Sequence, residues 1–239
     1  MGRAPIIPLA PGVYRIPTLG DFINSFAFVD DDESVTLVDC GVKRAPAKIV
    51  SALEAIGKTP ADVTRIVLTH AHNDHAGGAA QMVQRSSVDG VMVHAEDADF
   101  ISSGIGAPRD ESVRFGAMFS RMPGGGFAPV DVNEHLHDDF IIDVAGGIRV
   151  VHTPGHTPGH ISLLHEPTSV LITGDAIWNM RSRMSWPIAA FCTSAVLNQQ
   201  TAYVLGELDY SIAAFTHGPQ ISNDAREAVR GFLNRPSRD

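Results

Sequence analysis

Short apolar runs separated by turn-forming residues occupy positions 12–41 of the chain. An acidic turn at 30–33 precedes the last of these runs, a pattern that indicates an antiparallel β-meander. After Pro46 the apolar residues recur every three to four positions, as on one face of a helix, and Gly57 supplies a stop signal. The pattern therefore predicts three strands followed by one helix.

The next part of the chain alternates between strands and helices. Residues 65–69 form an apolar run typical of a buried strand, 75–85 suit a helix, and 90–94 predict another strand. Further strands are expected at 139–144, 148–152, 160–165, 168–173 and 210–215, and helices at 194–206 and 223–234, the last with Asn223 as N-cap. Because both halves contain strands followed by helices, we expect an α/β fold: a four-layer αββα sandwich of two mixed β-sheets packed face to face with helices outside.

Regular periodicity is lost between residues 101 and 130, where glycine and proline are frequent and phenylalanine and methionine are interspersed. An irregular apolar segment of this length inside a compact domain is typical of a lid or binding loop, and a loosely packed insertion is the alternative. We therefore expect this segment to help choose the substrate.

Composition narrows the class of protein. Of the 239 residues, 44% are hydrophobic and 19% charged, which predicts one folded domain over residues 1–239. The formal net charge of −9, without a basic cluster, argues against nucleic acid as a partner.

No apolar run approaches the roughly 18 residues of a membrane span, and no signal peptide is visible, so we expect a cytoplasmic protein without a membrane partner. The only cysteines, Cys40 and Cys192, are expected to be buried and apolar in role.

Residue types that commonly bind metals are concentrated in the six positions directly after the predicted 65–69 strand. They are His70, His72, Asp74 and His75. Zinc prefers imidazole nitrogen and carboxylate oxygen in a compact shell, so this group is typical of a site for a borderline-soft divalent metal.

Three later segments add candidate ligands, each after an apolar run and beside glycine or proline. Either His156 or His160 is available in the first, Asp175 in the second and His217 in the third. Strand ends in α/β folds gather polar side chains at one place. With one histidine of the pair, the set reaches seven ligands, too many for one four-coordinate ion but suited to two metals that share a carboxylate and a bridging hydroxide.

These motifs, HxHxDH at 70–75, PGHTPGH at 154–160, TGD at 173–175 and HGP at 217–219, resemble in the same order those of the metallo-β-lactamase superfamily, and the last two resemble its glyoxalase II branch. The resemblance implies that His70, His72 and His156 bind one ion, that Asp74, His75 and His217 bind the second, and that Asp175 bridges them. It also implies supporting roles for Asp39, by hydrogen bonding a ligand histidine, and for His160.

The resemblance implies a metal-dependent hydrolase with two divalent ions, of which zinc is expected and iron or manganese are alternatives. The bridging hydroxide would attack the carbonyl of a thioester, lactone or ester, and Asp74 would hold or relay a proton. The chain ends too soon after His217 for the glutathione-binding helices of glyoxalase II, so we expect a different small-molecule substrate. A mononuclear-iron oxygenase of the persulfide dioxygenase kind is the alternative function.

Two further expectations concern the surroundings of the site. The apolar residues of 113–127, with Trp178, Met180, Met184 and Trp186, are expected either to form an acyl-binding wall or to belong to the core or a homodimer interface. The remaining histidines are expected to be surface or hydrogen-bonded strand residues, although His94 ends a strand close to the cluster. They are His94, His135, His137, His152 and His165.

Overall fold

The computed structural model describes residues 6–110 and 126–235. Its first sheet begins as an antiparallel meander of β1 (Ile7–Ala10), β2 (Val13–Pro17), β3 (Asn24–Val29) and β4 (Val35–Val38). Three of these strands are the predicted ones. The pattern did not predict β1, because prolines interrupt it, but an edge strand tolerates a residue that cannot donate to the ladder.

Three strands parallel to β4 complete a seven-stranded sheet in the order β1 to β7: β5 (Val63–Val67), β6 (Val91–His94) and β7 (Val132–Leu136). The strand β7 was not predicted, because it is a largely exposed edge strand with little apolar alternation. Four helices lie against this half of the chain: α1 (Pro46–Ala55), α2 (Asn73–Ala76), α3 (Ala79–Arg85) and α4 (Ala98–Ser103).

The second sheet has five strands in the order β12-β11-β10-β9-β8. They are β8 (Ile141–Ile142), β9 (Ile148–His152), β10 (Ile161–His165), β11 (Val170–Ile172) and β12 (Ile212–Ala214). The helices α6 (Ala195–Ala202) and α7 (Ala225–Leu233) pack on it. Short 3-10 helices connect the described elements: η1 (Pro60–Asp62), η2 (Ala95–Asp97), η3 (Glu166–Thr168), η4 (Gly174–Ala176), η5 (Met180–Ser182), η6 (Ala189–Phe191) and η7 (Tyr203–Gly206).

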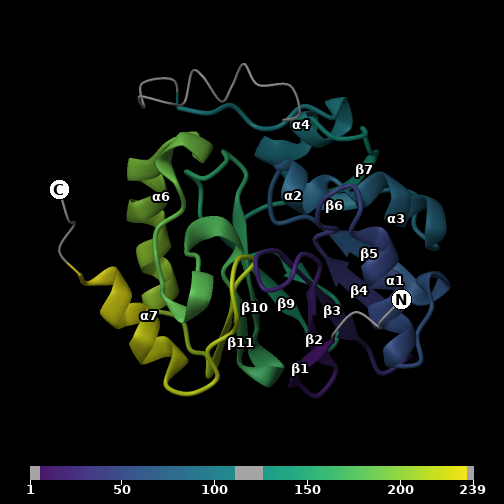
Figure 1. Ribbon diagram of the computed structural model, residues 1–239, viewed down its shortest axis with the longest axis horizontal. Coiled ribbons are helices and arrows are strands. Elements are labelled where there is room, and N and C mark those ends of the chain that lie inside the picture. Colours follow the sequence, from purple (N-terminus) through teal and green to yellow (C-terminus); the bar gives the residue numbers. More distant parts are fainter. Residues whose placement is uncertain (1–5, 111–125, 236–239) are drawn as a thin grey trace.

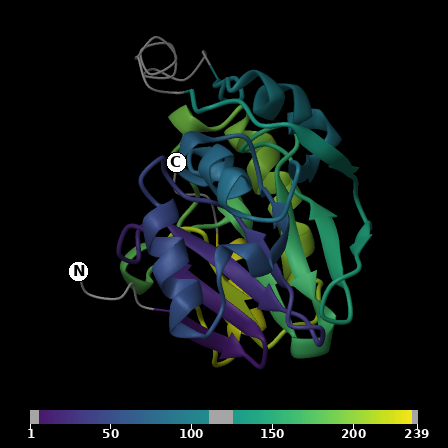
Figure 2. The ribbon, with the colours of Figure 1, turned by 90° about the vertical axis from the view of Figure 1, so that its right-hand side faces the viewer.

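The buried residues form three apolar layers. The middle layer, which includes Phe26 and Phe28 of the first sheet and Leu163 and Ile172 of the second, joins the two sheets face to face. The outer layers join each sheet to its helices. Figure 1 shows α6 and α7 on the left, α1 and α3 on the right, and the strands between them, and in Figure 2 the blue helices lie over the purple strands of the first sheet. The predicted four-layer αββα sandwich is confirmed.

Some element boundaries differ from the sequence expectation. The helix predicted at 75–85 is two helices, because the chain breaks at Gly77 and Gly78, where it approaches the backbone of the loop after β4. The last helix begins at Ala225 rather than after Asn223, because Asp224 takes a left-handed conformation and its side chain makes no capping bond. Part of the segment expected to be irregular forms α4, while residues 111–125 of the predicted lid lie outside the described residues.

Among the residues that the structure describes, no helix has both the length and the apolar character needed to cross a membrane.

One edge of the sandwich collects the carboxyl ends of several strands. The strands β4 and β5 run parallel in the first sheet, and β9, β11 and β12 share one direction in the second, because β10 pairs antiparallel with β9 and β11. Backbone bonds tie the two sheets together at this edge, from Ile161 N to Thr69 O (3.0 Å) and from Asn24 N to Thr216 O (2.8 Å). Side chains that follow these five strands therefore meet.

Candidate metal centre

The first three ligand candidates of one group converge from two loops. His70 and His72 follow β5, and His156 follows β9. Nδ1 of His72 lies 3.0 Å from Nε2 of His156, and candidate ligand atoms of all three residues lie within 4.8 Å of one another. Nε2 of His70 is buried and has no hydrogen-bond partner among the described residues, whereas its Nδ1 lies 3.0 Å from the Thr69 hydroxyl. This group is the one that the resemblance implies for the first ion.

The second group comes from α2 and the loop after β12. Asp74 and His75 lie on α2, and Nε2 of His75 is 3.3 Å from Nε2 of His217. The Asp74 carboxylate is 3.4 Å from His217 and 3.6 Å from His75, measured from Oδ2 to Nε2. The structure thus brings together the three residues implied for the second ion.

Asp175 lies between the two groups. Its Oδ2 is 3.2 Å from Nε2 of His156 in the first group and 3.2 Å from Nε2 of His217 in the second. Its Oδ1 is 3.5 Å from Nε2 of His75 and accepts a 2.6 Å hydrogen bond from the Thr216 hydroxyl. One carboxylate therefore contacts both groups, which is the position of a bridging ligand.

The spacing of these atoms fits divalent ions. Zinc–nitrogen bonds of about 2.0–2.1 Å in a tetrahedral shell put neighbouring ligand atoms about 3.3 Å apart. The nitrogen pairs at 3.0 and 3.3 Å and the carboxylate contacts at 3.2 Å match that separation. The orphaned Nε2 of His70, buried among further imidazoles, is a donor atom that a metal would satisfy.

The Nδ1 atoms of His217 and His75, which face away from the ligand groups, are hydrogen-bonded to neighbouring polar groups. Nδ1 of His217 donates to Phe22 O at 2.5 Å, and Nδ1 of His75 lies 2.9 Å from Oδ2 of Asp39. Asp39 also accepts from the backbone N and the hydroxyl of Thr69, both at 2.8 Å, and it has a positive φ of 57°. The non-glycine left-handed conformation costs free energy, which is consistent with a side chain whose placement matters. Asp39 thus lies where the resemblance implies.

His160 points its ring at the backbone rather than at the ligand groups. Its Nε2 accepts a 2.7 Å bond from the backbone N of Asp175, and its Nδ1 donates to Thr153 O at 3.0 Å. A Cβ on Gly174 would lie 2.4 Å from that Nε2, so only glycine permits this close approach. His160 therefore helps to position Asp175 through the main chain.

Burial lowers the pKa of some of these histidines, whereas nearby carboxylates raise the pKa of others. Burial holds the pKa of His70 and of His156 well below the ordinary value, so both are neutral lone-pair donors at neutral pH. Burial also opposes charge on His75, but the carboxylates of Asp175, Asp74 and Asp39 raise its pKa to about 9. The pKa of His217 is raised well above its ordinary value, because Asp175 and Asp74 outweigh its burial. His75 and His217, both in the group implied for the second ion, are thus protonated at neutral pH, and an ion bound there would displace these two protons.

Asp97 is an organising residue that the sequence pattern did not reveal. Its buried carboxylate accepts three 2.7 Å hydrogen bonds: from the backbone N of Ala71, from the Thr157 hydroxyl and from the backbone N of Gly159. Ala71 lies between His70 and His72, and the other two donors follow His156 in its loop. Its position three residues after the predicted strand end was the only available signal, and a polar residue there is common. Asp97 clamps the two loops that carry the first ligand group.

Cys192 was expected to be only a small buried residue, and it is fully buried. Its Sγ also lies 3.5 Å from Nδ1 of His156, opposite the nitrogen that faces the ligand group. The sulfur therefore contacts the nitrogen of His156 that the ligand group does not use. Nothing in the spacing of the two cysteines indicated that contact.

The predicted apolar wall divides into two parts. The ring of Trp178 lies 4.7 Å from that of His217, measured between centroids, and so borders the site. Trp186 contacts the ring of Phe232 in a tilted arrangement and packs with Met184 against the second sheet's helices. Trp186 and Met184 therefore follow the second alternative of that expectation, in which they belong to the core. Met180 is half-buried in η5, and residues 113–125 lie outside the described part of the chain.

The other histidines also have defined surroundings. His165 is bonded at both nitrogens, to Thr168 and to Ala145, and His135 and His137 are exposed, as expected. His94 is absent from the metal-binding groups that contain the seven candidates. Its ring stacks on that of His152 instead.

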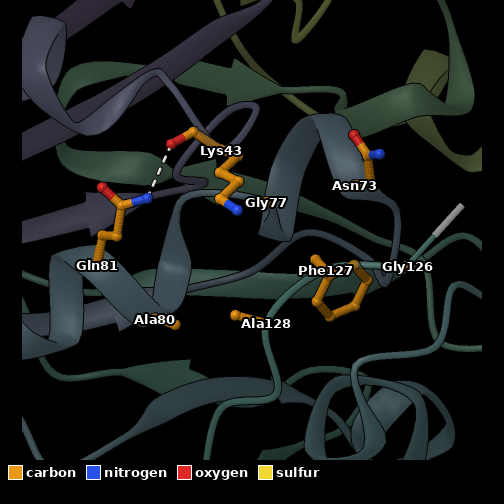
Figure 3. Close-up of a pocket in the computed structure, with 8 residues that line it drawn as sticks. All are labelled: Lys43, Asn73, Gly77, Ala80, Gln81, Gly126, Phe127 and Ala128. Carbon is orange, nitrogen blue, oxygen red and sulfur yellow. Dashed lines mark hydrogen bonds between the residues drawn. The ribbon is translucent and has the colours of Figure 1, made fainter. Parts of the chain in front are cut away.

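A cavity of about 300 Å³ lies beside α2 and α3. Figure 3 shows Lys43 and Asn73 on its upper side and the Phe127 ring below. The lining residues are Lys43, Asn73, Gly77, Ala80, Gln81, Gly126, Phe127 and Ala128. Asn73 directly precedes Asp74, so the cavity adjoins the loop of the ligand cluster and combines one cation with an aromatic ring.

Comparison with known proteins agrees with this geometry. Residues 19–230 match the family model described as the metallo-beta-lactamase superfamily. The chain is 27% identical to the probable metallo-hydrolase YybB of Bacillus subtilis over 81% of this chain and 80% of that protein, and 29% identical to an N-acyl homoserine lactonase of a Bacillus species over 63% and 54%. A metallo-beta-lactamase family protein from Thermus thermophilus superposes with a TM-score of 0.70 at 24% identity, covering 94% of this chain and 80% of that one, which shows the shared fold. The chain therefore belongs to the metallo-β-lactamase superfamily and is a metal-dependent hydrolase.

Proposed function

We propose that this protein is a dinuclear-metal hydrolase that cleaves a carbonyl ester-type bond in a thioester, lactone or ester. The observation that carries this proposal is the position of Asp175, whose carboxylate contacts His156 of one ligand group and His217 of the other. A mononuclear site would need only one of these groups. The ions would be zinc, with iron or manganese as alternatives.

Two ions held by these residues would supply hydroxide at neutral pH and would polarise the substrate carbonyl. Asp175 and Asp74 have different roles in the proposed reaction. Asp175 is 2% exposed, so its role is to hold the two groups at a fixed separation. The Asp74 side chain is 36% exposed, so of the two carboxylates it is the one that can face a substrate and relay a proton.

The substrate class is a proposal drawn from the site and its relatives. The Trp178 ring beside His217 offers an apolar face to an acyl group, and the N-acyl homoserine lactonase is a relative that acts on a lactone. We therefore favour a lactone or thioester with an apolar acyl chain over a β-lactam. A small-molecule substrate, the absence of nucleic-acid and membrane partners, a homodimer and a cytoplasmic location remain predictions, as does the narrower likeness to glyoxalase II.

The test combines metal analysis with a substrate panel. The wild-type protein should hold two divalent ions and hydrolyse members of a lactone and thioester series faster as the acyl chain lengthens. His70→Ala should lose bound metal and activity together, because the mutation removes one ligand of the first group, whereas His135→Ala, on an exposed position of β7, should change neither.

Two results would overturn the proposal. Full activity in His70→Ala with less than one ion per chain would exclude the two-metal mechanism. One iron per chain, with oxygen consumption and no hydrolysis across the panel, would identify a mononuclear oxygenase instead.

A further inference from the structure

The loop that carries His217 is bound by a residue of the other sheet. Asn24 begins β3 in the first sheet and is fully buried. Its backbone N donates to Thr216 O at 2.8 Å, and its side-chain Nδ2 donates to Phe215 O at 2.9 Å and to Gly218 O at 2.8 Å. One residue of the first sheet therefore holds the main chain on both sides of a ligand candidate from the second.

Arg15 fixes which end of the Asn24 amide faces these carbonyls. The buried NH1 of Arg15 donates to Oδ1 of Asn24 at 3.1 Å, and a guanidinium has no acceptor atom. The amide oxygen therefore faces Arg15, and both hydrogens of the NH2 group are left for the two carbonyls. The same NH1 donates to Oδ1 of Asp21 at 2.8 Å, so a carboxylate at the surface holds the guanidinium in turn.

Local structure alone does not fix the main chain at His217. The preceding strand, β12, is three residues long, and Gly218 has a φ of 110°, a conformation that is open to glycine because it has no Cβ. The loop between β2 and β3 supplies two further bonds, from Nδ1 of His217 to Phe22 O and from Gly218 N to Asp21 O at 2.8 Å. The position of His217 thus depends on contacts from the first sheet.

The ligand group of the first ion has a different anchor. Asp97 holds the loops of His70, His72 and His156 through its three hydrogen bonds. Within the described part of the chain, the Asn24 side chain bonds to Arg15, Phe215 and Gly218, and none of these residues lies in those loops. The loss of the Asn24 amide should therefore affect one ligand group and not the other.

We propose that Asn24 is a positioning residue for the second ion, and that Arg15 fixes its amide. Asn24 holds His217 where its Nε2 completes the group with Asp74 and His75. This inference rests on the dinuclear centre proposed above. Residues that orient metal ligands contribute roughly 10- to 100-fold to metal affinity, so the second ion should bind more weakly by about that factor without the amide, and the first should be unaffected.

A zinc titration followed through ring nitrogen resonances reports the two ions separately, because His156 responds to the first and His217 to the second. In Asn24→Ala, half-saturation of the His217 signal should move to roughly 10- to 100-fold higher free zinc, whereas that of His156 should stay at the wild-type value. The matched control is Ser25→Ala, which removes another buried polar side chain of β3, one without a hydrogen-bond partner among the described residues. This control should leave both half-saturations unchanged.

A second variant, Asn24→Asp, guards against a folding defect caused by the smaller alanine. Its carboxylate has nearly the size of the amide and keeps Arg15 as a partner, but it has no hydrogens for the carbonyls of Phe215 and Gly218. We expect the same selective shift, although a negative charge by itself favours cation binding.

The outcomes separate this inference from the proposed function. An unshifted His217 half-saturation in both Asn24 variants would overturn the positioning role, and so would equal shifts at His156 and His217, because they would indicate a general loss of structure. A wild-type protein in which only one of the two histidines responds to zinc would overturn the dinuclear centre, and the positioning role with it.

Discussion

Two buried aspartates, Asp39 and Asp97, orient the histidines that are candidate metal ligands, but they are not candidate ligands themselves. Asp39 holds Nδ1 of His75, and Asp97 holds the main chain beside His70, His72 and His156. Burial raises the pKa of Asp97 above its ordinary value, and the three hydrogen bonds counteract that rise. Such partners fix ligand orientation, so their loss should weaken metal binding more than it unfolds the protein.

The substitution Asp97→Asn tests this role. An amide replaces one acceptor oxygen by an NH2 group that faces backbone N–H groups, so at least one of the three bonds is lost. We expect metal affinity to fall roughly 10- to 100-fold, in the range seen for partners of ligand residues. Zinc competition with a chromophoric chelator measures the change.

Asp99→Asn is the control for that variant, because Asp99 is an exposed residue on the neighbouring helix α4. Its zinc affinity should equal that of the wild type. An Asp97→Asn protein with unchanged zinc affinity would show that the clamp between the two loops is dispensable.

The pKa of His75 predicts a pH dependence of metal binding. Because its pKa is raised to about 9 in the metal-free protein, His75 carries a proton at pH 7 that an ion must displace. Apparent zinc affinity should therefore rise as the pH increases toward about 9, and the raised pKa of His217 adds to the same trend. Calorimetric titration in buffers of different ionisation enthalpy should detect proton release at pH 7, and the absence of release would contradict the assignment.

At the scale of elements, the break between α2 and α3 shapes the ligand loop. A Cβ on Gly78 would lie 2.3 Å from the Cys40 carbonyl oxygen, and one on Gly77 would lie 2.1 Å from the Asn73 carbonyl oxygen. The two glycines let α2 approach the loop after β4, where Asp39 meets His75.

Gly78→Ala should be destabilising for that reason. The added methyl group meets backbone rather than a flexible side chain, so we expect a loss of about 1–3 kcal/mol in the free energy of unfolding. The matched change is Gly231→Ala in α7, where the Cβ has no neighbour within 4 Å and alanine favours the helix by about 0.5–1 kcal/mol. Urea denaturation of both variants checks the opposite signs, and a neutral Gly78→Ala would refute the steric argument.

At the scale of the whole molecule, the ligand candidates join the two halves of the sandwich. His70, His72, Asp74 and His75 follow a strand of the first sheet, whereas His156, Asp175 and His217 follow strands of the second. An ion bound by residues of both halves therefore stabilises their packing, because it binds the folded state and not the separated sheets.

Removal of metal should lower the melting temperature. An ion present at about 100 times its dissociation constant contributes about 2.7 kcal/mol, which corresponds to roughly 5–10 °C for a chain of this size. Scanning calorimetry before and after treatment with EDTA measures the shift, and added zinc should reverse it. Equal melting temperatures would mean that the sheets do not share an ion.

The sequence by itself determined the ligand candidates and the fold class. The His70–His75 cluster is dense enough to stand out locally, and His156, Asp175 and His217 each follow an apolar run that local periodicity identifies as a strand. These signals depend on residues close together in the chain, and so they are readable without the structure.

Only the tertiary structure decided how these residues work together. Spacing left both His156 and His160 open and the resemblance implied His156, but only the packed structure shows which ring faces the other candidates. The role of Asp97 depends on donors 26 and 62 residues away in the chain. The pairing of His94 with His152 depends on two strands from different sheets. Such contacts are set by how the sheets pack, because a side chain's partners at a sheet edge come from whichever loops the sandwich brings there, and no local pattern encodes that meeting.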